Sequence, residues 1–243
     1  MDKDFTARFR FPTTQWSLLT RVTAPDPETR APALEELCRI YWAPLYAFVR
    51  SKGVSHSEAE DITQGFFAEI IAKGQLENVN AERGRLRAYL LGGISKHTAK
   101  QWRNDHRQKR GGHATVVSLD HPAASEQNQI LDLTDHQTPE SSFERQWALT
   151  VIEHTLSRVA SSYAARGQAD IFEALKFAIT PGGEHRHYQD VATQTGLSAT
   201  AVKARIFRLR QRFIRELRKT VADTLTDETE IDEEIRRLMA VFK

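Results

Sequence analysis

The chain has 243 residues, 40% of them hydrophobic, and a formal net charge of only +2, which suits a globular protein of one large domain or two small ones. No run of eighteen apolar residues and no basic-then-apolar leader occurs, so neither a membrane span nor export is expected. The single cysteine, Cys38, excludes an internal disulfide and a thiolate metal cluster, and we expect a cytoplasmic protein without metal or other cofactor.

Residues 1–30 are proline-rich and predict a loose arm with one short helix over QWSLLTRV, capped by Thr13 or Thr14. A helix is expected from Ala33 to about Arg50, which Pro44 should bend or interrupt. The next helix should start at Ser55 or Ser57, followed by acidic residues in the first turn, and should stop at Gly74. These elements open a first domain, expected over residues 31–112.

The last helix of this domain is expected from Arg85 to about Lys109, before the Gly111-Gly112 pair. Gly92 and Gly93 lie inside it and indicate either a close-packing point or a kink. Residues 113–138 are polar, acidic and without periodicity, which predicts an extended linker.

A second domain is expected over residues 139–225, with a helical run opening at Pro139 and another helix from about Gln168 to Ile179. No segment alternates with period two for long enough to predict a strand. The expected fold is therefore all-α, with two helical domains joined by the linker. The tail, residues 226–243, has apolar residues at helical spacing behind an acidic first turn, which predicts an amphipathic helix.

The segment YQDVATQTGLSATAVKARIFRLRQRF, from Tyr188 to Phe213, has the form of a helix-turn-helix. Gly196 can adopt the left-handed conformation that ends the first helix, and Leu197 should be buried in the turn. The Ser198 hydroxyl can cap the second helix. Apolar residues then recur every three or four positions on one side, with cations elsewhere, so the second helix is the candidate DNA reader.

Charge is distributed in blocks. Nine Lys or Arg residues and one acid occupy residues 83–110, and eight Lys or Arg residues and one acid occupy residues 203–219. Between them, residues 111–144 carry six acids and no Lys or Arg. Two basic surfaces separated by an acidic connector suggest a single polyanion bound at two places. The alternative is that these cations are only solvated helix surfaces.

The order of these motifs resembles the bacterial RNA polymerase sigma factors, specifically the compact extracytoplasmic-function type. The resemblance rests on EAEDITQGFF, on GRLRAYLLGGISKHTAKQWRNDHRQKRGG, and on the helix-turn-helix after the acidic linker. It covers roughly residues 34–225, which would comprise a region 2-like and a region 4-like domain. It implies a protein that is not an enzyme but binds core RNA polymerase and promoter DNA.

The resemblance assigns polymerase binding to the helix that carries DxxQ, here Glu60, Asp61 and Gln64. Gly65 replaces the acidic residue that usually follows this Gln in the family, which removes a charge. The apolar positions of the same helix fit an ordinary core-facing stripe equally well, and both interpretations can hold together.

In the family, the basic helix engages the −10 element as the duplex opens, and the loop before it, here residues 76–82, receives an extruded base. Tyr89 and Trp102 offer stacking faces, although core packing explains them equally well. The residues expected to bind the −10 element are Arg87, Tyr89, Lys96, Lys100, Trp102, Arg103, Arg107, Lys109 and Arg110.

The second helix of the helix-turn-helix would read the −35 element in the major groove. Its first turns should reach base edges, and later arginines should contact phosphates. The residues expected at this interface are Ser198, Thr200, Ala201, Lys203, Arg205, Arg208, Arg210 and Arg212.

Two other functions are alternatives to this one. A stand-alone helix-turn-helix regulator of duplex operators would need dimer symmetry, for which no coiled-coil seam is visible. A nucleic-acid enzyme would need metal ligands such as Asp61, Glu69 and a histidine such as His97, and the two acids are better explained as helix-surface charges. Whether an anti-sigma factor, the tail or phosphorylation restrains the protein stays open, and the tail is either a restraint on DNA binding or a packing helix.

Overall fold

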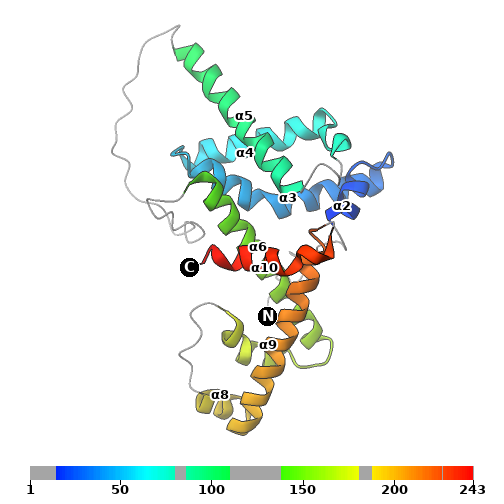
Figure 1. The fold of residues 1–243 in the computed structure, drawn as a ribbon, viewed down its shortest axis with the longest axis vertical. Coiled ribbons are helices and arrows are strands. Elements are labelled where there is room, and N and C mark those ends of the chain that lie inside the picture. The colour runs from blue at the N-terminus through cyan, green and yellow to red at the C-terminus, as the bar shows by residue number, and fades with distance from the viewer. Residues whose placement is uncertain (1–14, 80–85, 110–137, 181–187, 226, 243) are drawn as a thin grey trace. The chain divides into compact units, whose positions relative to one another are not determined.

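A computed structural model describes residues 15–79, 86–109, 138–180, 188–225 and 227–242. This part of the chain is all-α, as expected, with nine α-helices and no β-strand (Figure 1). Its contacts define two compact units. The amino-terminal unit comprises residues 15–148 together with residues from 238 onward, and the carboxyl-terminal unit comprises residues 149–237.

The amino-terminal unit is built on α2 (Gln15–Val22), α3 (Pro27–Arg50), α4 (His56–Ala72) and α5 (Leu86–Lys109), with a short 3-10 turn, η1 (Gln75–Asn78). α3 begins earlier than expected because Asp26 caps it, its Oδ2 accepting from the Thr29 amide at 2.9 Å, and Pro27 fits the first turn. The helix then continues through Pro44 to Arg50. α4 starts at one of the two expected caps, Ser55, whose Oγ accepts from the Glu58 amide.

The core of this unit lies between α3, α4 and α5, where Phe48, Phe66 and Ile94 are buried. Gly93 of α5 faces Phe66 of α4, and a Cβ at Gly93 would lie 2.9 Å from the phenyl Cε2. Gly92, in contrast, is exposed and has open space around it. Of the two explanations for this glycine pair, close packing therefore accounts for Gly93.

The start of α6 (Pro139–Ala164) belongs to the amino-terminal unit. Trp147 is fully buried there and stacks on Tyr41, with ring centroids 5.3 Å apart and planes inclined by 8°. The expected domain boundary at residue 138 follows the change in composition, whereas the contacts divide the chain within α6, after Ala148. Most of the expected linker, residues 113–137, lies outside the described residues.

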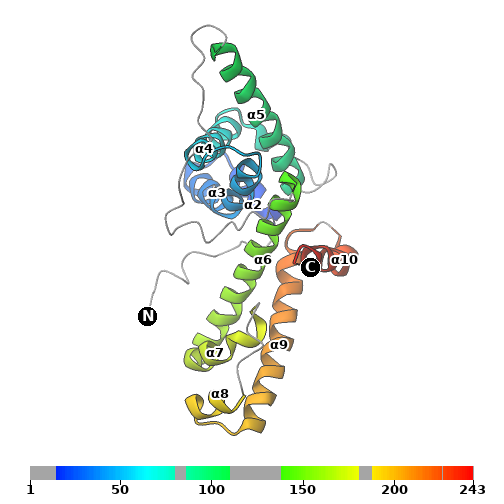
Figure 2. The ribbon, with the colours of Figure 1, turned by 90° about the vertical axis from the view of Figure 1, so that its left-hand side faces the viewer.

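The carboxyl-terminal unit contains the rest of α6, then α7 (Ala169–Leu175), a 3-10 turn η4 (Lys176–Ile179), α8 (Tyr188–Thr195) and α9 (Ala199–Ala222). Its core is a cluster in which Val159, Phe172, Val191 and Ile206 come from α6, α7, α8 and α9 in turn. Figure 2 shows α7 at the lower end of α6 and α8 beneath it, while α9 runs alongside the lower part of α6. The cluster therefore holds four helices around one apolar centre.

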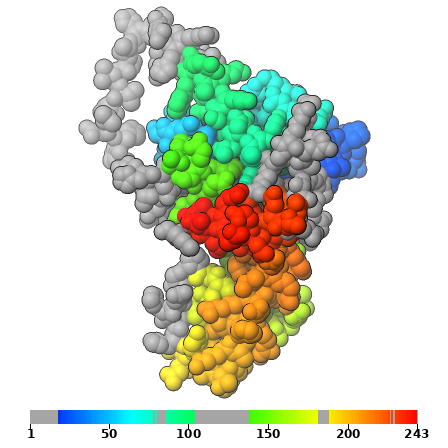
Figure 3. Space-filling view, in the orientation of Figure 1, coloured from blue at the N-terminus to red at the C-terminus, as the bar shows by residue number. Residues whose placement is uncertain are grey.

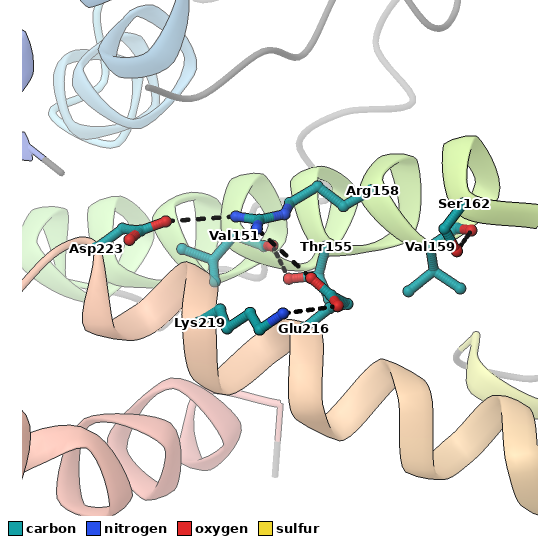
Figure 4. A network of polar contacts seen from close by, with 8 residues as sticks. All are labelled: Val151, Thr155, Arg158, Val159, Ser162, Glu216, Lys219 and Asp223. Atoms are coloured by element: carbon teal, nitrogen blue, oxygen red, sulfur yellow. Dashed lines mark hydrogen bonds and ion pairs between the residues drawn. The ribbon is translucent and has the colours of Figure 1, made fainter. Parts of the chain in front are cut away.

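A polar network fixes α9 against α6 within this unit (Figure 4). The Arg158 guanidinium of α6 lies 3.5 Å from Glu216 and 3.3 Å from Asp223, both near the carboxyl end of α9. The Lys219 Nζ also pairs with the Glu216 carboxylate, 3.3 Å from its Oε1. Burial raises the pKa of the Asp223 carboxyl, an effect that Arg158 opposes by favouring its ionised form.

The tail forms α10 (Ile231–Ala240) after a 3-10 turn, η6 (Glu228–Glu230). In the carboxyl-terminal unit, Asp232 of α10 forms an ion pair with Arg218 of α9. In the amino-terminal unit, the Arg145 guanidinium carbon lies 5.6 Å from the centroid of the Phe242 ring. Across the described ranges, no helix combines the length and apolarity needed to cross a bilayer.

Candidate nucleic-acid interface

The helix-turn-helix is built from α8, α9 and the three residues between them. Gly196 has φ +67°, the left-handed conformation expected of it. The Leu197 amide donates to the Ala192 carbonyl at 3.1 Å, which closes the end of α8 in the Schellman manner. Ser198 then caps α9, its Oγ accepting from the Ala201 amide at 3.2 Å. These local predictions for Gly196 and Ser198 are confirmed.

The core face of α9 determines which side chains can meet a ligand. Val202, Ile206 and Leu209 are buried in the carboxyl-terminal cluster. The opposite side of the helix is exposed, and Figure 3 shows a broad area of α9 and α8 surface in orange and yellow. Thr200, Lys203 and Phe207 lie on this exposed side near the start of the helix. The capped, exposed start of α9 can therefore approach a groove without unpacking the core.

The expected −35 residues separate into three groups. Ser198, Thr200, Ala201 and Lys203 are at the start of α9, where the Lys203 ammonium is 5.8 Å from the centroid of the Tyr188 ring. Arg210 donates from its Nε to the Ala178 carbonyl at 3.1 Å, so it also ties α9 to η4. The third group, Arg205, Arg208 and Arg212, lines a pocket beside α6 and α7.

Two apolar residues of α9 were not singled out by the sequence pattern. Phe207 is 63% exposed and Ile214 is 50% exposed. They lie seven residues apart and so share one face of the helix. The sequence alone could have identified them as exposed, because neither residue falls on the buried stripe formed by Val202, Ile206 and Leu209.

In the amino-terminal unit, α5 presents part of the expected −10 surface. Lys96, Lys100 and Arg103 are exposed, and Arg103 donates from Nε to the Ala99 carbonyl at 3.2 Å. Tyr89 is 38% exposed, and its hydroxyl donates to the Gln75 carbonyl at 3.1 Å. Trp102 is half-buried, with the Lys52 ammonium 6.0 Å from its ring centroid.

Arg87 departs from the expectation. Its side chain is buried, its Nη1 lies 3.8 Å from a carboxylate oxygen of Glu144, and its guanidinium carbon lies 6.0 Å from the Trp147 ring centroid. The guanidinium is therefore part of the packing of α6 on α5 rather than of a DNA-facing surface. Burying a cation is costly unless a counter-charge compensates it, and Glu144 supplies that charge.

The remaining −10 candidates are not fully described. Arg107 and Lys109 lie on the last turns of α5, and Arg110 lies outside the described residues. The loop expected to receive a base, residues 76–82, is described only as far as Val79. A cavity of about 560 Å³ does lie between α4 and α5, lined by Tyr89, Lys96, His97, Lys100 and Glu69 among others.

The Glu69 carboxylate pairs with two of the side chains that line this cavity, His97 and Lys100. Hydrogen bonds from Lys73 and then from His97 lower the pKa of its carboxyl to about 2, with Lys100 adding to the effect. The His97 Nδ1 is 2.7 Å from Glu69 Oε2, and the Lys100 Nζ is 3.5 Å from Oε1. Glu69 thus holds two residues of α5 against α4.

The expected polymerase-binding residues share the exposed side of α4. Glu60, Asp61 and Gln64 are all exposed, whereas Ile62 and Phe66 of the same helix are buried. The polar face and the core-facing stripe therefore coexist on one helix. Gly65 faces the His97 ring, whose Nε2 would be in ordinary contact with a Cβ at that position, 3.4 Å away.

Within the described ranges, no group of three or more His, Cys, Asp or Glu side chains is placed to hold a metal ion. Comparisons of the chain with protein-family models, with curated proteins and with solved structures find no match.

Proposed function

We propose that the protein is a sigma factor of the extracytoplasmic-function type, a subunit that binds core RNA polymerase and directs it to promoters. The observation that carries this proposal is the helix-turn-helix, in which a capped helix presents Thr200 and Lys203 beside a buried apolar stripe. Such a helix fits the major groove, whose base edges offer donors and acceptors to side chains in its first turns.

The electrostatics of α9 favour a nucleic-acid partner. The free amides at its start carry a partial positive charge, which supports a nearby phosphate. Lys203 adds a full charge within the first two turns, and Phe207 offers an apolar face for a thymine methyl group. This arrangement supports recognition of a −35 element by the carboxyl-terminal unit.

The amino-terminal unit offers a second basic surface. Lys96, Lys100 and Arg103 on α5 can hold phosphates, and the partly exposed Tyr89 ring can stack on an unpaired base. This surface suits a −10 element that opens during initiation. The exposed Asp61 and Gln64 of α4 are the proposed contact with core polymerase.

The test is transcription from a promoter fragment by purified core RNA polymerase with and without this protein. Templates are selected from the genomic sites that the protein occupies together with polymerase. Specific transcripts that appear only with the protein support the proposal. Duplex binding without any transcript on these templates contradicts it and favours a stand-alone regulator.

Two matched variants separate the proposed contacts. Asp61→Asn should weaken association with core polymerase and leave duplex binding unchanged. Glu35→Gln removes the same charge from an exposed position on α3 and should leave both unchanged. Equal losses from both substitutions would show that α4 has no special part in polymerase binding.

Salt gives an independent check of the DNA surface. A protein that contacts about six to ten phosphates should lose roughly a thousandfold or more in affinity between 50 and 200 mM salt. Lys203→Gln should lower the slope of log affinity against log salt by about 1 if the residue contacts a phosphate. A flat response in the unmodified protein would contradict binding at both basic surfaces.

A further inference from the structure

A pocket of about 480 Å³ lies within the carboxyl-terminal unit, where α9 passes the junction of α6 and α7. Arg205, Arg208, Arg212 and Arg215 line it from α9, and Arg166 lines it from the segment between α6 and α7. Figure 2 shows these helices together in the lower part of the view. The α9 arginines recur every three or four residues, so they share one face of the helix.

The five guanidinium groups around this pocket carry positive charge that no carboxylate of the described residues balances. In the described ranges, none of the five makes an ion pair with a carboxylate, whereas Arg158 and Arg218 of the same unit do. The nearby Glu216 is engaged by Arg158 and Lys219. Gathering like charges in a concave site is unfavourable without an anion, so the pocket is suited to a ligand of high negative charge.

Arg212 is half-buried in this pocket. Its guanidinium carbon lies 5.8 Å from the centroid of the Tyr163 ring, and its Nε is buried without a hydrogen-bond partner among the described residues. A buried donor without an acceptor costs free energy. An anionic oxygen that entered the pocket would provide an acceptor.

One end of the pocket, formed by Arg212 and Arg215, lies far along α9 from the start of the helix. At 1.5 Å per residue, Arg212 lies about 21 Å and Arg215 about 26 Å beyond the Ser198 cap. The major groove is only about 12 Å wide, so a helix that inserts its first turns leaves these residues beyond the base edges. The pocket is also concave and of a volume typical of small-molecule sites, about 300 to 1,000 Å³.

We propose that this pocket binds a small polyphosphate, a ligand with at least two linked phosphate groups. Arginine suits it because a planar guanidinium can donate two parallel hydrogen bonds to phosphate oxygens. A single phosphate can satisfy only part of the five-arginine set, and a chain of phosphates spans more of it. The site is independent of the proposed polymerase contact.

The experiment is calorimetric titration of the full chain with inorganic triphosphate at constant ionic strength. We expect saturable binding of one triphosphate with a dissociation constant below about 1 mM, and weaker binding of orthophosphate. Arg215→Gln should weaken triphosphate binding about tenfold, since each charge-assisted hydrogen bond contributes strongly. Because Arg215 is exposed, this substitution should not affect folding.

Lys203→Gln is the matched control, because it removes one exposed cation from the same helix outside the pocket. It should weaken duplex DNA binding and leave triphosphate binding unchanged, the opposite of Arg215→Gln. Absence of saturable triphosphate binding overturns the proposal, as does an equal loss from both variants. Loss of duplex binding in Arg215→Gln without triphosphate binding would assign the arginines to DNA phosphates instead. None of these outcomes depends on whether the protein binds polymerase.

Discussion

The Cβ that Gly93 lacks would lie 2.9 Å from Cε2 of Phe66, so α4 and α5 are packed as closely as a glycine permits. Gly93→Ala should therefore force the phenyl ring or the helix to shift. We expect a loss of about 1–3 kcal/mol in the free energy of unfolding, the usual cost of overpacking a core. Urea denaturation of the full chain measures this value.

Gly92→Ala is the control for that substitution. Gly92 has open space around it, and alanine favours a helix by about 1 kcal/mol relative to glycine. We expect it to be neutral or stabilising. If both variants lose the same free energy, the close approach of Phe66 is not what requires a glycine at position 93.

Trp147 should contribute more than Trp102 to the stability of the amino-terminal unit. It is fully buried and stacked on Tyr41, so Trp147→Ala should cost about 3–5 kcal/mol of unfolding free energy. Trp102→Ala makes the same substitution at a half-buried position on α5 and should cost much less. Chemical denaturation of both variants compares them, and equal costs would contradict the assignment of Trp147 to this core.

Substitutions of Ser198 should separate helix capping from DNA binding. Ser198→Ala removes the acceptor for the Ala201 amide and should cost about 0.5–2 kcal/mol of stability. Ser198→Asn and Ser198→Asp both restore a capping acceptor and should retain stability.

The affinity for duplex DNA should then differ between the two capping variants, Ser198→Asn and Ser198→Asp. The aspartate places a negative charge at the start of α9, where we propose that DNA lies, and should weaken binding. The neutral asparagine should not. Thermal unfolding and a duplex-binding titration test this, and unchanged affinity in Ser198→Asp would place the DNA elsewhere.

The lowered pKa of Glu69 predicts a pH dependence of stability. Its ordinary value is 4.5 and its folded value is about 2, because Lys73, His97 and Lys100 favour the carboxylate. A carboxyl with a lowered folded pKa stabilises the fold above its unfolded pKa, and this contribution is lost as the pH falls. We therefore expect the unfolding midpoint to decrease between about pH 4.5 and pH 2.

Glu69→Gln tests this origin. The variant should be less stable than the unmodified protein at neutral pH and should show a smaller decrease through the same acid range. Glu35→Gln, at an exposed position on α3, should keep the full decrease. Identical acid profiles for the unmodified protein and Glu69→Gln would assign the pH dependence to other groups.

The sequence by itself determined the features that depend on near neighbours along the chain. Helical periodicity predicted the all-α fold, and the Gly196 and Ser198 positions of the turn follow from backbone and capping preferences within a few residues. The exposed acidic and polar face of α4 was likewise readable, because Asp61 and Gln64 fall opposite its apolar stripe.

The tertiary structure decided what depends on residues far apart. It buried Arg87 against Glu144 and Trp147, which no local pattern separates from the exposed cations of the same helix. It also brought Arg166 beside the arginines of α9. A charge or an apolar residue acquires its role from the partner that packing supplies, and helical periodicity specifies a face without specifying what meets it.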